Sequence, residues 1–337
     1  MNLIGIDLGG ANIKLTDLNH LATSLSFPLW KQKENLAETL RKLLSEYPRS
    51  DRIALTMTGE LADCFSTKAE GVRYITQAVV EAAGETPVSV WQTAGEFVSP
   101  AIAIEFPLLT AAANWHALAT WSARATAGSS GLLIDIGSTT ADIIPLKQGV
   151  CASAGLTDFE RLRAGELVYT GGRRTPLCAV ARSVMLDGKE VPLAAELFAT
   201  TQDIYQLLDL LPEQPDSFDT ADGRPADIAH AYGRIAKMVC CDVHELGMDR
   251  IRNIAEQLAE HQLAMLKQAT RQVIAQLSYQ PEHIICSGSS EFLVKRLVKA
   301  IPALKDTAVI SLSETVSPEI ASAACAHAVT FLAYERC

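Results

Sequence analysis

The chain has 337 residues, of which 48% are hydrophobic and 20% charged, and its formal net charge is -10. This length suits two domains that each bury a core, and the acidic balance excludes a general nucleic-acid binder. No apolar run approaches the ~20 residues of a membrane-spanning helix. Because the 8 cysteines are scattered without a Cys-x-x-Cys pair and no basic leader precedes the first apolar run, we expect a cytoplasmic protein with reduced thiols.

The first part of the chain is predicted to alternate strands and helices. Apolar spacing separates the two types, and Gly, Pro or Asn marks their ends. The predicted elements are a strand at 3–7, a return strand at 13–18, a helix at Leu36–Tyr47, a strand at Arg52–Met57, a helix at Gly71–Ala83, a strand at Val88–Trp91, and a helix from Asn114, its cap, to about Ala127.

The second part repeats this alternation with longer helices. Cys240 and Cys241, near His230 and His244, match no zinc spacing and are interpreted as core residues of a helix. The predicted elements are strands at 132–136 and 142–146, a surface loop at Pro212–Pro225, helices at about Ala226–Leu246 and Asp249–Leu277, a strand at His283–Cys286, a helix at Glu291–Ala300 capped by Ser289 or Ser290, and a closing helix at Pro318–Tyr334.

One strand-and-turn pattern occurs twice. Ile6-Asp7-Leu8-Gly9-Gly10-Ala11-Asn12 aligns with Ile134-Asp135-Ile136-Gly137-Ser138-Thr139-Thr140, aspartate on aspartate and glycine on glycine. Such a strand brings a carboxylate to the edge of a sheet, and the small residues let backbone N–H groups approach phosphate oxygens. Because aspartates do not bind phosphate directly, we expect Asp7 and Asp135 to hold Mg²⁺. Two facing turns of this kind would form a phosphate clamp.

A third small-residue turn follows near the end of the chain. Cys286-Ser287-Gly288-Ser289-Ser290 leads from a predicted strand into the start of a helix, whose dipole favours an anion or a nucleotide phosphate. Each turn alone is a weak signal, but three in this order favour a functional site.

These three segments resemble the phosphate-1, phosphate-2 and adenosine motifs of the acetate and sugar kinase, Hsp70 and actin superfamily. The resemblance implies an α/β fold of two actin-like ATPase (ribonuclease H-like) domains with a central phosphate-binding cleft. It places an N-terminal actin-like domain at 1–128 and a C-terminal one at 129–337, with a helical insertion around 155–280.

A narrower resemblance comes from the second turn and from segments outside the turns. Asp135, Gly137, Thr139 and Asp142 match the Asp-x-Gly-x-Thr-x-x-Asp form of hydantoinase/oxoprolinase proteins. The segments that resemble the tetrahydromethanopterin-linked one-carbon branch of these proteins are Thr56–Asp63, Thr67–Val72, Gly165–Pro176 and Ala221–Ala226.

That branch includes transferases of methanofuran biosynthesis. The resemblance therefore implies that the cleft joins an aminomethylfuran-methyl diphosphate to a tyramine- or tyrosine-type phenol and releases pyrophosphate. The implied partners are these two small molecules, without nucleic acid or membrane, and Mg²⁺ is the implied cofactor. ATP stays an alternative ligand, and a homodimer stays open.

The same resemblance implies roles for individual residues. Glu60 is the candidate base for the phenol, with Asp63 as an alternative, and Lys68 and Asn114 are candidates for substrate binding. His116 is expected to be structural. The candidates for phosphate binding are Gly9, Gly10, Lys14, Gly137, Ser138, Thr139, Thr140, Arg173, Arg174, Gly288 and Ser289.

Alternatives remain open for the cationic residues and for the function. Lys14 either contacts phosphate or lies on a solvated hairpin face, and Arg173 and Arg174 either bind the distal phosphate or serve as one exposed and one ion-paired arginine. An ATP-dependent small-molecule kinase or hydantoinase-like hydrolase is the second functional hypothesis, because function does not follow from fold. A non-catalytic nucleotide-gated binding protein is the third.

Overall fold

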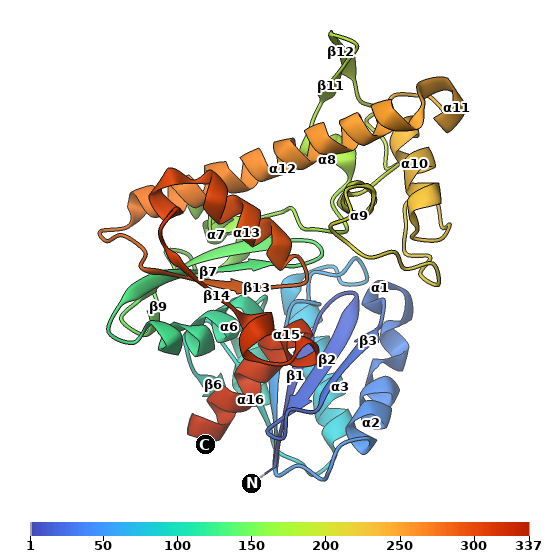
Figure 1. The fold of residues 1–337 in the computed structure, drawn as a ribbon. Helices are drawn as coiled ribbons and strands as arrows, with labels where there is room; N and C mark the ends of the chain where they lie inside the picture. The colour runs from blue at the N-terminus through green and yellow to red at the C-terminus, as the bar shows by residue number, and fades with distance from the viewer. Residues whose placement is uncertain (1, 337) are drawn as a thin grey trace.

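Two mixed β-sheets, one in each half of the chain, form the framework of the computed structural model, which describes residues 2–336 (Figure 1). The first sheet has the strand order β3-β2-β1-β4-β5-β6, in which β1 pairs antiparallel with β2 and parallel with β4. Its strands are β1 (Leu3–Leu8), β2 (Asn12–Asp17), β3 (Ala22–Ser26), β4 (Arg52–Met57), β5 (Val88–Trp91) and β6 (Phe97–Val98).

The second sheet repeats the core of this topology. Its order is β10-β8-β7-β13-β14, and β7 pairs antiparallel with β8 and parallel with β13. Its strands are β7 (Ser130–Ile136), β8 (Ala141–Lys147), β10 (Leu167–Val168), β13 (His283–Ser287) and β14 (Ala308–Ser311), with β9 (Val150–Cys151) beside β8; β11 (Ser183–Leu186) and β12 (Lys189–Pro192) form a separate hairpin. The chain is therefore an α/β protein whose two halves share the same central strand topology.

Helices pack on both faces of each sheet. In the first half these are α1 (Leu29–Gln32), α2 (Leu36–Ser45), α3 (Lys68–Ala83), α4 (Pro100–Glu105), α5 (Pro107–Thr110) and α6 (Asn114–Ser122). In the second half they are α7 (Asp158–Ala164), α8 (Leu177–Val180), α9 (Thr201–Leu207), α10 (Ile228–Lys237), α11 (Val243–Leu246), α12 (Met248–Gln276), α13 (Glu291–Ala300), α14 (Leu312–Thr315), α15 (Pro318–Ser322) and α16 (Ala324–Arg336). Short 3-10 turns complete the chain at Lys33–Asn35, Ala123–Thr126 and Pro302–Leu304.

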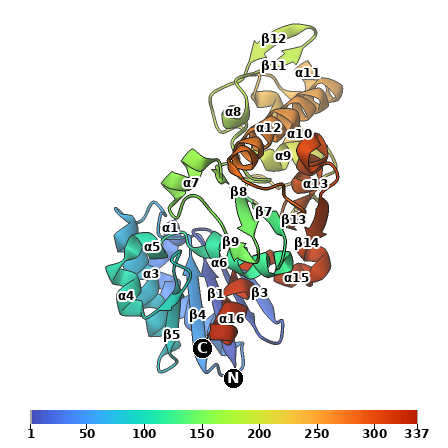
Figure 2. The ribbon, with the colours of Figure 1, turned by 90° about the vertical axis from the view of Figure 1, so that its left-hand side faces the viewer.

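The last helix returns to the first half of the molecule. α16 packs against α6 and against β1, β2 and β4, as the two views show (Figures 1 and 2). A Cβ atom at Gly5 would lie 2.1 Å from the Thr330 hydroxyl oxygen, so only glycine permits this approach. The hydroxyls of Thr16 and Thr330 are 2.8 Å apart. With the predicted domain boundary at residue 128, α16 belongs to the C-terminal segment but packs on the sheet of the N-terminal one.

Three apolar clusters hold these layers together. One fills the second half under α12 and α13, and another fills the first half under α2 and α3. The third lies between the sheets, where Leu3 and Trp91 of the first meet Leu133 and Ile285 of the second around α6 and α16. Burial of these residues fixes the two halves against each other, which sets the positions of the turns at their facing edges.

Several predicted elements are confirmed with their bounds, including β4, β5 and α13. The helix predicted from about Ala226 to Leu246 is wrong as a single element, because α10 ends at Lys237 and α11 begins after Asp242. Asp242 accepts hydrogen bonds from the backbone N–H groups of His244 and Glu245 at 2.7 and 2.9 Å, which starts a new helix.

Other predictions need correction at helix ends. Asn114 is the first residue of α6 rather than its cap, since its side-chain oxygen accepts from the next N–H group, that of Trp115, at 2.7 Å. Ser290 occupies the cap position of α13 without a capping side-chain bond. The closing helix is broken at Ala323 into α15 and α16, where the chain turns from the second half to the first.

The cysteines described are all free thiols. Cys240 and Cys241 lie beyond the end of α10, so their placement in a helix is wrong; Cys240 is exposed, whereas Cys241 is half-buried and packs against the apolar core. Across residues 2–336, no helix is both long and apolar enough to cross a membrane.

Candidate functional site

The duplicated hairpins have the same hydrogen bonds in both halves. The Gly9 N–H donates to the Asn12 carbonyl oxygen at 2.9 Å, and the Gly137 N–H donates to that of Thr140 at 2.9 Å. The neighbouring strands repeat as well, since Gly59 N–H donates to Leu8 O at 3.0 Å and Ser290 N–H donates to Ile136 O at 3.0 Å. The sequence alignment of the two turns therefore corresponds to one structural unit built twice.

Asp7 lies in β1 of the first unit, whose residues are all buried. Its side chain is 6% exposed, and its Oδ1 atom has no hydrogen-bond partner. Burial raises the pKa of Asp7, while the charge of Lys14 and the side chain of Asn114 lower it. Lys14 pairs with Asp7 across β1 and β2, and Asn114 begins α6. Three predicted site residues are thus brought together around one carboxyl group.

Asp135 occupies the equivalent position at the end of β7. Burial and the charge of Asp142, its partner across β7 and β8, raise the pKa of Asp135 to about 7, whereas Ser287 and Lys14 lower it. Gly288 has a φ of +95°, and a Cβ atom there would lie 2.6 Å from Asp135 Oδ1. The third turn therefore passes directly over the second carboxyl group, which requires glycine at this position.

Lys14 and Cys325 each interact electrostatically with both aspartates. The positive charge of Lys14 lowers the pKa of both carboxyl groups, so one cation of the first hairpin acts on the acids of both hairpins. Burial, followed by the negative charges of Asp7 and Asp135, raises the pKa of the Cys325 thiol, which α16 contributes. No sequence signal marked Cys325, because it sits in a small-residue helix that tertiary packing alone brings here.

Glu60 lies at the same sheet edge as the first turn. It follows β4, and a Cβ atom at the preceding Gly59 would lie 3.1 Å from the Gly9 carbonyl oxygen. The Glu60 side chain is 1% exposed, and its Oε2 atom has no partner. Burial raises its pKa to about 7, against a lowering by the charge of Lys68. Such a group exchanges a proton near neutral pH, as a general base must.

A chain of charged groups connects Glu60 to the second aspartate. Lys68, at the start of α3, forms a 3.3 Å ion pair with Asp158, at the start of α7. Arg161, 1% exposed, contacts Asp158 at 3.5 Å and also pairs with Asp142. This network crosses between the halves, so Lys68 is occupied by a protein carboxylate, and Asp142 is neutralised beside Asp135.

The two arginines predicted to bind phosphate lie on a loop docked against the second turn. The N–H groups of Arg173 and Arg174 donate to the Ser138 carbonyl oxygen at 3.1 and 2.9 Å, and that of Gly172 donates to Gly137 O at 3.0 Å. The Arg174 guanidinium lies 5.6 Å from the ring centre of Trp30, in the first half. Arg173 is half-buried and contacts carboxamides. Across residues 2–336, neither arginine is paired with an acid.

The remaining candidates differ in exposure. Gly10 is half-buried with open space around it, Ser138 and Thr139 have hydroxyl oxygens 3.4 Å apart, and Ser289 is exposed. Thr140 contributes the carbonyl oxygen that closes the second turn. Asp63, the alternative base, is exposed and lies outside this buried region.

The acids of the turns fit a magnesium ion better than a transition metal. Within residues 2–336, no group of three or more His, Cys, Asp or Glu side chains is arranged to hold a metal. Mg²⁺ keeps several waters and is usually bound through one or two carboxylates together with substrate phosphates. Asp7, with its unpartnered Oδ1 atom, and Asp135 supply such a set.

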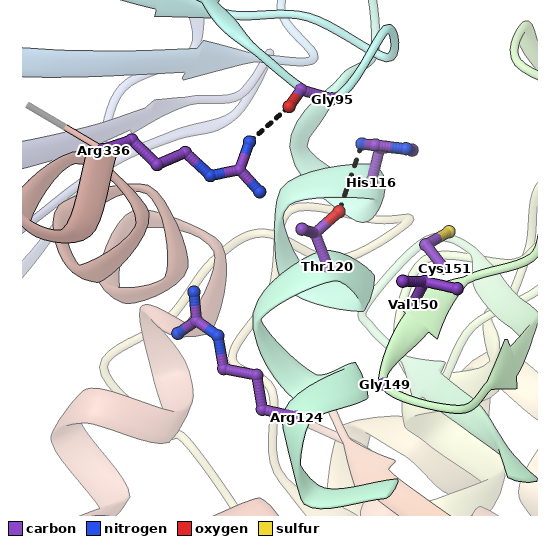
Figure 3. Close-up of a pocket in the computed structure, with 8 residues that line it drawn as sticks. All are labelled: Gly95, His116, Thr120, Arg124, Gly149, Val150, Cys151 and Arg336. Atoms are coloured by element: carbon purple, nitrogen blue, oxygen red, sulfur yellow. Dashed lines mark hydrogen bonds between the residues drawn. The ribbon is translucent and has the colours of Figure 1, made fainter. Parts of the chain in front are cut away.

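A separate cavity of about 310 Å³, lined by none of the turn residues, lies beside α6 (Figure 3). His116 and Thr120 line it, 3.4 Å apart, together with Arg336, which donates to the Gly95 carbonyl. Burial and the charges of Arg161 and Arg336 lower the pKa of His116 to about 4, so it is neutral at pH 7. His116 therefore faces this cavity, apart from the carboxyl groups of the turns.

Sequence reasoning missed Arg161, Asp158 and Cys325. Asp158 and Arg161 lie in the predicted insertion, where a helix with mixed charges resembles an ordinary solvated surface. Only the folded structure shows that Arg161 is buried and that it connects Asp158 with Asp142.

A family model described as hydantoinase/oxoprolinase matches residues 51–329. The chain is also similar to a protein of Methanocaldococcus jannaschii named (4-{4-[2-(gamma-L-glutamylamino)ethyl]phenoxymethyl}furan-2-yl)methanamine synthase, with 33% identity over 98% of this chain and 97% of that protein. A protein of Methanococcus vannielii with the same name is 32% identical over 60% of this chain and 89% of its own length.

Among solved structures, the chain is similar in fold to an acetone carboxylase in its nucleotide-free form. The TM-score is 0.51 at 13% identity, and the match covers 95% of this chain and 51% of that one. This likeness concerns the fold.

Proposed function

The chain belongs to the hydantoinase/oxoprolinase family, and from this premise we propose that it is a transferase of methanofuran biosynthesis. It is an enzyme, since both curated relatives are synthases. Their shared name describes a phenoxymethyl group on a furan, that is, an ether between a phenol oxygen and a furan-bound CH₂ group. The substrates proposed here are an aminomethylfuran-methyl diphosphate and a tyramine- or tyrosine-type phenol.

The observation that carries this proposal is the combination of two acids on equivalent turns with a buried glutamate whose Oε2 atom has no hydrogen-bond partner. Asp7 and Asp135 would hold Mg²⁺, which supplies charge neutralisation for a diphosphate when bound. We expect backbone N–H groups and hydroxyls of the turns at 9–10 and 137–140 to bind the phosphate oxygens, and Lys14 adds a positive charge that acts on both acids. These groups favour the departure of pyrophosphate, because its negative charge grows as the C–O bond breaks.

Glu60 is the proposed base for the acceptor. A phenol has an unperturbed pKa of ~10, so its oxygen attacks efficiently only if a base takes the proton as the bond forms. With a pKa of about 7 and an unpartnered Oε2 atom, Glu60 is suited to accept that proton. The balance is one C–O bond formed, one C–O bond broken, pyrophosphate released and one proton transferred to Glu60. Asn114 would orient the substrate beside Asp7, whereas the pairing of Lys68 with Asp158 favours a role in joining the halves.

The test is a direct comparison of substrates. Purified protein is incubated with MgCl₂ and either the furan diphosphate plus tyramine or ATP plus tyramine, and ³¹P NMR resolves pyrophosphate from ADP. We expect pyrophosphate and a phenoxymethylfuran product only in the first mixture. ADP with a phosphorylated product, and no pyrophosphate from the furan, would contradict the proposal and favour the ATP-dependent alternative.

A further inference from the structure

The half-buried Arg173 differs in its partners from Arg161 and Arg234, which are buried in the second half. Its Nη1 group donates to Gln214 Oε1 at 2.9 Å and to Gln202 Oε1 at 3.4 Å, and both acceptors are neutral amides. By contrast, Arg161 pairs with Asp142, and Arg234 donates to Asp203 Oδ1 at 2.8 Å. Within the described part of the chain, the charge of Arg173 is therefore not compensated by a carboxylate.

This uncompensated charge is costly unless a ligand neutralises it. Burial lowers the pKa of Arg173, which reflects the loss of water around the guanidinium. The two amides hold the group in place without cancelling its charge. A protein that needed only a structural arginine here would gain from an acid at position 202 or 214, so the neutral partners point to an anionic ligand.

Gln202 supplies an independent sign of a ligand. Its side chain is 7% exposed, and its Nε2 group has no hydrogen-bond partner. Because arginine can only donate hydrogen bonds, the Gln202 oxygen must face Arg173, which leaves the NH₂ group on the same carbon as a free donor. A buried donor beside an unpaired cation matches the acceptor oxygens of a phosphate.

The backbone places these donors beside the second turn. The Arg173 N–H donates to Ser138 O at 3.1 Å, and the Gln202 N–H donates to Arg173 O at 3.2 Å. Arg234 anchors the surrounding elements, because it binds Asp203 of α9 and Asp222 of the following loop, at 2.8 and 3.1 Å. The Ala221–Ala226 segment therefore lies in the same region of the molecule as the Gly165–Pro176 segment.

We propose that Arg173 and Gln202 form the receptor for the terminal phosphate of the diphosphate substrate, with Gln214 as the positioning residue for Arg173. This inference rests on the proposed function for the identity of the substrate, and it assigns part of the diphosphate site to the helical insertion. The interaction of Arg173 and Gln202 with the terminal phosphate becomes stronger as pyrophosphate leaves, since negative charge accumulates on the leaving group.

The test measures the binding of inorganic pyrophosphate with MgCl₂ by isothermal titration calorimetry on the full chain. Gln202→Glu and Gln214→Glu each place a carboxylate beside Arg173, and we expect each to weaken pyrophosphate binding on the order of tenfold or more. Gln77→Glu, which adds the same charge at an exposed position of α3, is the matched control and should bind as the wild type does. Wild-type affinity in both Gln214→Glu and Gln202→Glu would overturn the proposal.

Two controls keep the result decisive. Gln214 is exposed, so Gln214→Glu tests the receptor even if Gln202→Glu does not fold, as judged by circular dichroism. Turnover of the furan diphosphate is measured separately. If the wild type turns over the furan diphosphate but the variants bind pyrophosphate as tightly as the wild type, only the receptor is rejected. If the variants bind pyrophosphate more weakly but the wild type does not turn over the furan diphosphate, only the proposed function is rejected.

Discussion

The two halves of the chain build the same strand-and-turn edge, but they partner its acids differently. Counted from the paired strands, Glu60 and Glu291 occupy equivalent positions, two residues beyond Thr58 and Ser289. Glu60 leaves Oε2 unpartnered, whereas Glu291 accepts bonds from the hydroxyls of Ser311 at 2.6 Å and Ser313 at 2.7 Å. One glutamate is free to exchange a proton, and the other is part of the framework.

The residues opposite the aspartates differ in the same way. Lys14 stands across from Asp7, but Asp142 stands across from Asp135 and is neutralised by Arg161. In the first half, the residue opposite the aspartate is therefore a cation. In the second half, it is an acid that forms a buried ion pair with an arginine. Duplication has kept the geometry of the site while its chemistry diverged. The following variants test this difference between the halves, beginning with the two aspartates, at which the halves should behave alike.

The largest effect is expected for Asp7→Asn and Asp135→Asn. If both aspartates hold Mg²⁺ on the diphosphate, each variant should lose roughly 10³-fold or more in turnover, because neither half neutralises the phosphates alone. Pyrophosphate release measures turnover, and thermal unfolding should show that both variants remain folded. Asp63→Asn, at an exposed acid, is the control. Near-normal turnover in one of the two site variants would show that the halves do not share the metal role.

The next largest effect separates the residues opposite the aspartates. Arg161→Met leaves Asp142 buried without its cation, and removing one partner of a buried pair costs about 3–5 kcal/mol in the free energy of unfolding. The double variant Arg161→Met/Asp142→Leu should recover much of that loss. Lys14→Met in the first half should change stability by less than about 1 kcal/mol, because Lys14 is only half-buried and forms no ion pair with Asp7 among residues 2–336. Urea unfolding measures all three, and equal losses for Arg161→Met and Lys14→Met would contradict this difference between the halves.

Much of the framework was predictable because its signals are local. The strands at Arg52–Met57 and Val88–Trp91 and the helix at Glu291–Ala300 are bounded by turn residues and have a clear apolar period, so their ends were predicted correctly. The facing of Asp7 and Asp135 could also be expected, since two copies of one hairpin form equivalent sheet edges.

Other parts of the site depend on contacts between distant segments. Cys325 reaches the aspartates only because α16 packs on β1, and Arg161 of α7 meets Asp142 of β8 only in the folded chain. Gln202 lies on a helix of only seven residues whose side chains are all buried, so no amphipathic period marks its role. Such positions are set by tertiary packing, which leaves no periodic trace in the sequence.

A smaller effect concerns the pH dependence of stability in the first half. Native Glu60 keeps its proton up to about pH 7, whereas the unfolded chain releases it near 4.5. Between these values the native state binds more protons, so Glu60 makes stability fall as pH rises. Relative to the wild type, Glu60→Gln should gain roughly 3 kcal/mol between pH 4.5 and pH 8. Urea unfolding across this range measures the difference, with exposed Glu81→Gln as control, and a pH-independent difference would contradict the free state of Glu60.

The smallest effect is expected at the equivalent glutamate of the second half. Glu291→Gln keeps the shape of the side chain but weakens bonds from Ser311 and Ser313, which should cost about 1–2 kcal/mol of stability. Its turnover should stay within roughly twofold of the wild type, while Glu60→Gln should lower turnover about 10²-fold without a loss of stability. If Glu291→Gln lost turnover as Glu60→Gln does, both acids would take part in the reaction, and the two halves would differ in hydrogen bonding but not in role.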